Sequence, residues 1–157
     1  MNIQSAIIEG VNILNSKYIQ TAQLDTEILM AKALGRDRKY IILNNNKDLL
    51  DKNLKYFKRL VKERSYRKPI AQIINKKFFW NSEFFITSDT LIPRPDTELL
   101  IEQILKLSKH KNRMNILDIG VGSGCILLSI LKERKKFYGT GIDISKNCLN
   151  ISKINAK

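Results

Sequence analysis

The sequence predicts an N-terminal all-α bundle, a β-hairpin connector and an incomplete Rossmann-like α/β sheet. Three observations support this order. Apolar residues recur at helical spacing through 1–67, and aromatic and β-branched segments flank a polar turn within 68–90. A strand, a glycine loop and a helix then follow one another within 91–157, as in the first unit of an open α/β sheet. We therefore expect domain boundaries near residues 67 and 90.

Residues 1–67 are predicted to form a small helical bundle. Apolar spacing indicates a helix over 3–14 and a second helix that Thr21 caps and Gly35 ends. A short helix over 38–43 precedes the longest one, 48–64. The residues expected to face inward are Ile3, Ile7, Ile8, Val11 and Leu14 in the first helix, Leu24, Ile28, Leu29 and Ala33 in the second, and Leu49, Leu50, Leu54, Phe57, Leu60 and Val61 in the longest.

The longest helix also carries a basic row opposite its apolar face, formed by Lys52, Lys55, Arg59 and Lys62. Such a row is consistent with a solvated helix surface and equally with a partner contact.

The connector is predicted to begin where Pro69 ends the helical region. Segments 70–74 and 78–80 are expected to pair with 84–86 across a polar turn at 81–83, with their aromatic rings packed in the core. Two prolines then make a stiff entry to a helix capped by Asp96. The apolar face expected for this helix is Leu99, Leu100, Ile104 and Leu107.

The segment 116–124 is the strongest indication of a ligand site. A short apolar strand, expected to be buried, is followed by Gly120, Gly122 and Gly124 and then by a helix from Cys125. A second strand, 137–142, ends in Asp143, whose carboxylate suits the two hydroxyls of a ribose. A phosphate-binding P-loop would require Gly-Lys-Ser/Thr, and a dinucleotide loop would place a Gly or Ala at Cys125. A plain glycine turn without a ligand is the remaining alternative.

Composition narrows the functional classes. The 157 residues are 43% hydrophobic and carry a net charge of +13, which favours attraction to an RNA-rich partner. No apolar run is long enough to span a membrane, and the N-terminus lacks the pattern of a signal peptide, so we expect a cytoplasmic protein. Two cysteines make no disulfide framework, and the single histidine, His110, supports no metal site. Cys125 near a helix N-terminus is expected to have a lowered pKa.

Taken together, these motifs resemble the peptide chain release factor glutamine methyltransferases, the HemK/PrmC family. The resemblance covers nearly the whole chain, and the segment 91–98, Leu-Ile-Pro-Arg-Pro-Asp-Thr-Glu, is its most specific part. It implies that S-adenosylmethionine is the cofactor and that 91–157 is the N-terminal part of a methyltransferase domain. The implied cofactor-binding residues are Asp118, Gly120, Val121, Gly122, Ser123, Gly124 and Asp143, and the implied site-lining residues are Arg94, Pro95, Asp96 and Glu98.

The resemblance also implies a reaction and its partners. Family members transfer a methyl group to the side-chain amide of the glutamine in the Gly-Gly-Gln loop of release factors. The bundle, 1–67, would help to hold the release factor. Contact with the ribosome would be indirect, and no DNA, membrane or metal would take part.

The sequence departs from the family in one respect. The family's Asn-Pro-Pro-Tyr motif, which orients the glutamine amide, does not occur in these 157 residues, so no catalytic residue is expected. Only two strand–helix units are present, which favours a truncated form that is inactive alone over a chain completed by a second polypeptide. The alternatives are a non-catalytic module that binds a release factor or the ribosome, and an NAD-linked protein, which Cys125 disfavours.

Overall fold

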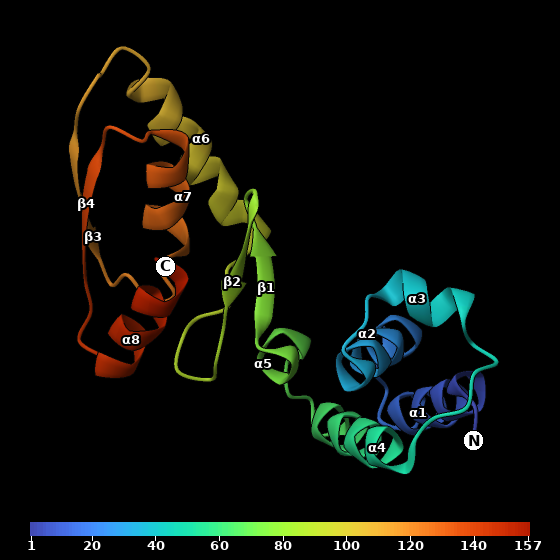
Figure 1. Ribbon diagram of the computed structural model, residues 1–157. Helices are drawn as coiled ribbons and strands as arrows, with labels where there is room; N and C mark the ends of the chain where they lie inside the picture. The colour runs from blue at the N-terminus through green and yellow to red at the C-terminus, as the bar shows by residue number, and fades with distance from the viewer. The chain divides into compact units, whose positions relative to one another are not determined.

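The computed structural model describes residues 1–157, which form two compact units (Figure 1). Unit 1 is Met1–Ile74 and unit 2 is Asn75–Lys157. Eight α-helices and two small sheets make up the chain, so the fold is helix-rich with a partial α/β sheet. No helix has both the length and the apolar character that a membrane crossing needs.

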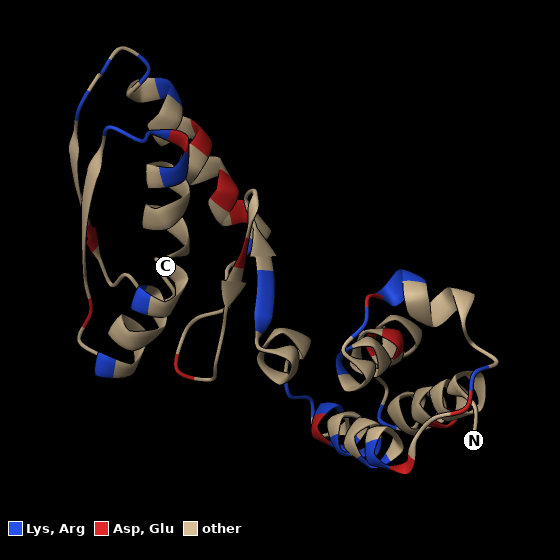
Figure 2. Cartoon of the chain, viewed as in Figure 1, with Lys and Arg blue, Asp and Glu red and all other residues tan.

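Unit 1 is built from five helices around one apolar core. The helices are α1 (Ile3–Asn15), α2 (Ala22–Leu34), α3 (Arg38–Leu43), α4 (Asp51–Ser65) and α5 (Ile70–Ile74). Gly35 ends α2 in the left-handed conformation, at φ 62°, as predicted. The fully buried residues of the core include Ile3, Leu14, Leu29, Met30, Ile41, Phe57, Leu60 and Val61. Basic residues in this unit recur along α4, where the ribbon is repeatedly blue (Figure 2).

Several expectations for unit 1 are wrong in detail. Residues 70–74 form the helix α5 rather than a strand, because Pro69 starts a helix here: its carbonyl accepts from the N–H groups of Gln72 and Ile73. Thr21 precedes α2, but its hydroxyl donates to Asp25 rather than accepting from the helix backbone. Helix α4 begins at Asp51 rather than at residue 48. Three residues expected to face inward, Ile8, Leu24 and Leu50, are exposed.

Unit 2 contains an antiparallel hairpin and a parallel pair of strands. The hairpin joins β1 (Lys76–Phe79) to β2 (Ser82–Phe85), so its turn is formed by Trp80 and Asn81 rather than by the predicted 81–83. The 3₁₀-turn η1 (Pro95–Thr97) leads into α6 (Glu98–Leu107). The parallel strands are β3 (Asn115–Ile119) and β4 (Tyr138–Ile142), followed by α7 (Cys125–Glu133) and α8 (Lys146–Asn155) respectively.

The helices of unit 2 cover one face of the parallel strands (Figure 1). On that face, Ile116 packs against the core that also contains Ile130 of α7. The opposite face is bare, and its apolar side chains Leu117, Ile119 and Tyr138 are 58%, 76% and 66% exposed. The expectation of a fully buried strand at 116–119 is therefore wrong for one of its two faces.

Helix α6 buries a different stripe from the predicted one. Ile101 is fully buried, and Ile104 and Leu105 pack on the same core, whereas Leu99, Leu100 and Leu107 are exposed. The i, i+3, i+4 spacing from Ile101 sets this inward face. The carboxylate of Asp96 caps no helix, because neither η1 nor α6 has a side-chain cap.

We predict that residues 1–74 fold as an isolated peptide, because every member of their core cluster lies within this range. The peptide should show helical circular dichroism and a cooperative urea transition. Helices α1, α2 and α4 meet closely at Gly10, where a Cβ would come within 2.8 Å of Thr26 Cγ2 and 3.1 Å of Phe57 Cζ. The substitution Gly10→Val should therefore lower the free energy of unfolding by about 1–3 kcal/mol.

The matched control is Asn12→Val on the exposed side of α1, which should change stability little. A structureless spectrum for the peptide, or equal midpoints for the two variants, would contradict the proposed core.

Candidate functional site

The candidate site lies at the carboxyl ends of β3 and β4. Parallel strands end at the same edge of a sheet, so the loop after β3 and the residue after β4 are neighbours. The strands pair in register from Asn115 with Tyr138 to Ile119 with Ile142. Beyond this last pair, the N–H groups of Gly120 and Val121 both donate to the Ile142 carbonyl, at 2.8 and 3.0 Å. The glycine loop therefore begins fixed to the end of β4.

The loop requires its glycines. Gly120, Gly122 and Gly124 have φ values of 83°, 52° and 81°, a region that residues with side chains rarely adopt. The last of them is the residue before α7, and its carbonyl accepts from Leu128 N at 2.9 Å in the first turn. No atom lies within 4 Å of the Cβ position at Gly120, so the loop backbone is open there.

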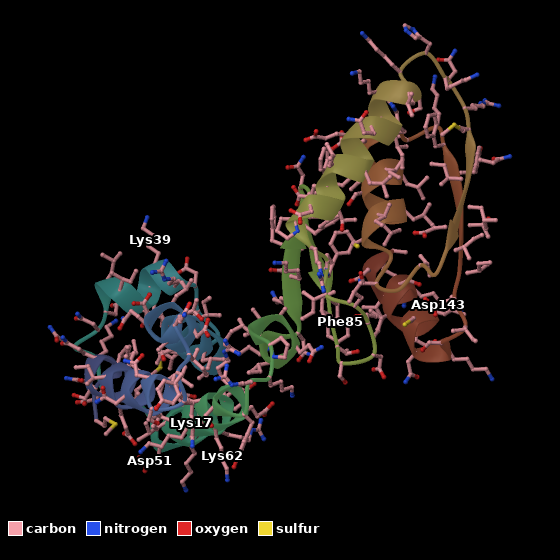
Figure 3. The ribbon with its side chains drawn as sticks, turned by 180° about the vertical axis from the view of Figure 1, so that it is seen from behind. Lys17, Lys39, Asp51, Lys62, Phe85 and Asp143 are labelled. Atoms are coloured by element: carbon pink, nitrogen blue, oxygen red, sulfur yellow. The ribbon has the colours of Figure 1, made fainter.

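Asp143, which is labelled in Figure 3, fastens the loop to the start of α8. Its Oδ2 accepts from Gly122 N–H at 2.9 Å, and its Oδ1 accepts from Ser145 N–H at 2.9 Å. The backbone N–H groups of Ser145 and Gly122 hold the pKa of the Asp143 carboxyl below its ordinary value, because they stabilise the charged form. One ionised side chain thus organises both the glycine loop and the next helix.

A second carboxylate, Asp118, lies on the helix-covered side of β3, opposite Gly141 in the register. Burial raises the pKa of Asp118, the N–H of Leu127 in the first turn of α7 opposes this, and the negative charge of Asp143 adds to the rise. The negative charge of Asp143 therefore disfavours the ionised form of Asp118. A cationic group placed near them would relieve that repulsion.

The remaining residues named from the sequence are placed as follows. Val121 and Ser123 are buried within the loop. Arg94, Pro95 and Asp96 are exposed around η1, and no hydrogen bond or ion pair joins them to the loop. Glu98 accepts from the backbone N–H of Trp80 at 2.7 Å, which ties the first turn of α6 to the hairpin.

Two residues that support the loop had not been recognised in the sequence. The side-chain amide of Asn155, at the end of α8, donates to the carbonyls of Ser123 at 2.8 Å and Phe85 at 3.0 Å. Ser145 caps α8 by accepting from Cys148 N at 3.3 Å. The serine is a recognisable N-cap signal in the sequence, whereas nothing local identifies Asn155.

The thiol of Cys125 does not behave as its position at the helix start suggested. Burial raises its pKa above the ordinary value, so the expected lowering is wrong. No group of three or more His, Cys, Asp or Glu side chains is arranged to hold a metal ion.

Comparison with known proteins identifies relatives over nearly the whole chain. Residues 5–74 match the PrmC N-terminal domain. The chain is 37% identical over 156 residues to the release factor glutamine methyltransferase of Buchnera aphidicola from Acyrthosiphon pisum, covering 99% of this chain and 55% of that protein. The corresponding protein of Leptospira interrogans is 37% identical, with 99% and 54% covered, and that of Clostridium acetobutylicum 33% identical, with 99% and 54% covered.

These matches confirm the resemblance noted in the sequence, and the chain spans about half the length of the curated relatives it matches.

We predict that Asp143→Ala accelerates amide hydrogen exchange at Gly122 and Ser145, because both N–H groups lose their acceptor. In the unchanged chain, protection of these two amides should persist at neutral pH. It should be lost as the pH falls through the folded-state pKa of Asp143, which lies below the ordinary aspartate value.

The control is Glu102→Ala, which removes an exposed carboxylate from α6 in the same unit and should leave both amides protected. Unchanged exchange in Asp143→Ala would contradict its role in holding the loop.

Proposed function

We propose that this chain supplies the cofactor-binding part of an S-adenosylmethionine-dependent methyltransferase that acts on the glutamine amide of release factors. The observation that carries the proposal is the glycine loop fastened to Asp143 at the carboxyl edge of two parallel strands. This is the edge at which Rossmann-like α/β sheets bind their ligands. The relatives are release factor glutamine methyltransferases, and their name supplies the reaction and the substrate of the proposal.

The acidic character of the site supports S-adenosylmethionine as its ligand. That cofactor carries a sulfonium and an ammonium group, and a cation bound beside Asp118 would offset the burial and the Asp143 charge that raise the pKa of Asp118. Each oxygen of Asp143 accepts one backbone N–H, so each has a further lone pair for a ribose hydroxyl. The open backbone at Gly120 leaves room for close approach of the ligand. We assign Val121, Gly122, Ser123 and Gly124 to the same loop contact.

The roles of this chain's residues follow from what the reaction needs. When bound, S-adenosylmethionine supplies an already activated methyl group, so neither a metal nor a strong general acid is required. What the protein must provide is orientation of cofactor and amide, a contribution of up to roughly 7–11 kcal/mol in favourable systems. The loop and Asp143 would orient the cofactor. The Asn-Pro-Pro-Tyr motif that orients the amide in the family is not among these 157 residues.

We assign the parts of the chain accordingly. The bundle, residues 1–67, would bind the release factor. Residues 68–90 would connect the bundle to residues 91–157, which would form the first part of the methyltransferase domain. Arg94, Pro95 and Asp96 would line the site, since their side chains are exposed, while Glu98 fixes their segment to the hairpin. The bare face of β3 and β4 would be covered by further polypeptide, because parallel sheets are normally covered on both faces.

We predict that methyl transfer to a release factor requires more than these 157 residues. The chain alone should transfer no labelled methyl from S-adenosylmethionine. A fusion to the part of the Leptospira interrogans relative that the chain does not cover should transfer it. Within that fusion, Asp143→Ala should weaken cofactor binding about tenfold or more, the usual cost of hydrogen bonds to a charged group. Calorimetry measures the affinity and radiolabel incorporation measures the transfer.

Glu102→Ala in the same fusion serves as the control and should leave both quantities unchanged. Saturable labelling by the 157 residues alone, abolished by Asp143→Ala, would show that the catalytic groups lie within this chain. Cofactor affinity that Asp143→Ala leaves unaltered would refute the assignment of the ribose contact.

A further inference from the structure

The positive charge of unit 1 is concentrated on one helix. Residues 1–74 contain fourteen basic and seven acidic side chains, a net charge of +7. Residues 51–68, which comprise α4 and the turn after it, contain eight of the basic and only two of the acidic ones, a net charge of +6. Figure 2 shows the basic residues repeated along this helix. The positive charge of unit 1 is therefore localised on α4 and the turn after it.

Four of these eight basic side chains form ion pairs or hydrogen bonds within unit 1. Arg64 pairs with Asp25 at 2.7 Å, Lys58 with Glu9 at 2.8 Å and Lys68 with Glu63 at 2.6 Å. Arg67 donates to the Lys17 carbonyl at 3.1 Å. The four that remain are exposed and have no ion-pair partner: Lys52, Lys55, Arg59 and Lys62.

These four cations form a single row, which we call the basic stripe. Their spacing of three, four and three residues places them one turn apart, about 5.4 Å per turn, on one side of the helix. The opposite side of α4 is its buried face, formed by Phe57, Leu60 and Val61. The stripe therefore points into solvent along its whole length.

Exposed aromatic rings accompany the stripe. Tyr66 follows Lys62 by four residues, so it continues the row, and it is 74% exposed. Tyr18, 86% exposed, is beside the turn that Arg67 holds through the Lys17 carbonyl. Within the row, the guanidinium of Arg59 stacks over the ring of Tyr56, 4.9 Å from its centre. A line of cations that ends in exposed rings is typical of surfaces that bind single-stranded nucleic acid.

We propose that the basic stripe, together with Tyr66, binds single-stranded RNA. A row of unpaired like charges matches a polyanion with a phosphate at every step, whereas protein surfaces intersperse both signs. A membrane surface is disfavoured because the apolar face of α4 is buried and offers nothing to insert. The choice of RNA over DNA rests on the proposed function, since release factors act in translation.

The stripe is separate from a cavity elsewhere in unit 1. A cavity of about 320 Å³ is lined by residues of α1, α2 and α3 and of the loop after α3, among them Ile7, Glu27 and Ile41, and by none from α4. Binding of RNA to the stripe therefore leaves that cavity open for a protein partner.

The test measures fluorescence anisotropy of a labelled twelve-nucleotide single-stranded RNA with the whole 157-residue chain. The triple variant Lys55→Gln, Arg59→Gln, Lys62→Gln should bind at least tenfold more weakly at 0.1 M salt. It should also reduce the slope of log affinity against log salt by about 2, at roughly 0.7 per neutralised phosphate. Tyr66→Leu should weaken RNA binding without changing that slope.

The matched control is the triple variant Arg36→Gln, Lys39→Gln, Lys47→Gln. It also removes one arginine and two lysines, all exposed, from unit 1. Figure 3 shows Lys39 on the other side of unit 1 from Lys62. This control should retain RNA binding, and circular dichroism should show that both triple variants keep the helical content of the unchanged chain.

Four results would overturn the proposal. Equal losses of RNA affinity in the two triple variants would mean that the net charge of the chain, and not the position of the stripe, determines binding. Binding of a labelled polyglutamate of equal charge as tightly as the RNA would assign the stripe to acidic proteins. Tighter binding of DNA of the same sequence would contradict the assignment to RNA. A lack of saturable RNA binding would show that the basic stripe is not a nucleic-acid-binding surface. Methyl transfer is not measured, so failure here is distinct from failure of the proposed function.

Discussion

The arrangement of unit 2 around its site depends on the carboxylate of Asp143. It accepts one hydrogen bond from Gly122 in the loop after β3 and one from Ser145 at the start of α8. Hydrogen bonds to a charged acceptor are roughly twice as strong as those between neutral groups. A single residue can therefore hold a loop whose positive φ values are unfavourable for residues other than glycine. Asn155 adds a second tie from the other end of α8, to Ser123. The loop is thus held between two ends of one helix.

One face of the parallel strands β3 and β4 carries exposed apolar side chains. Leu117, Ile119 and Tyr138 remain exposed although they belong to a parallel pair, a type of sheet that normally lies between layers of helices. Large apolar side chains grouped on an open face favour association with further polypeptide. The half of the structure that contains the organised glycine loop is therefore also the half with an uncovered apolar face.

The elements governed by local rules could be predicted from the sequence. The glycine loop was recognisable because three alternate glycines demand unusual backbone angles, and the end of α2 because Gly35 adopts one. The helix α5 was missed since an isoleucine-rich segment resembles a strand, and Pro69 was taken to end a helix rather than to begin one. The role of Asn155 could not be predicted, because its partner Phe85 lies 70 residues away in the chain.

The central claim is that the loop after β3 and the acid after β4 form one site for S-adenosylmethionine. Titration of the ¹⁵N-labelled chain with the cofactor, followed through backbone amide chemical shifts, tests it most directly. The account predicts saturable shifts concentrated at Gly120, Gly122 and Ser145, with unit 1 unaffected. Saturable shifts confined to unit 1, or no shifts at the glycine loop under conditions where the cofactor binds, would contradict it.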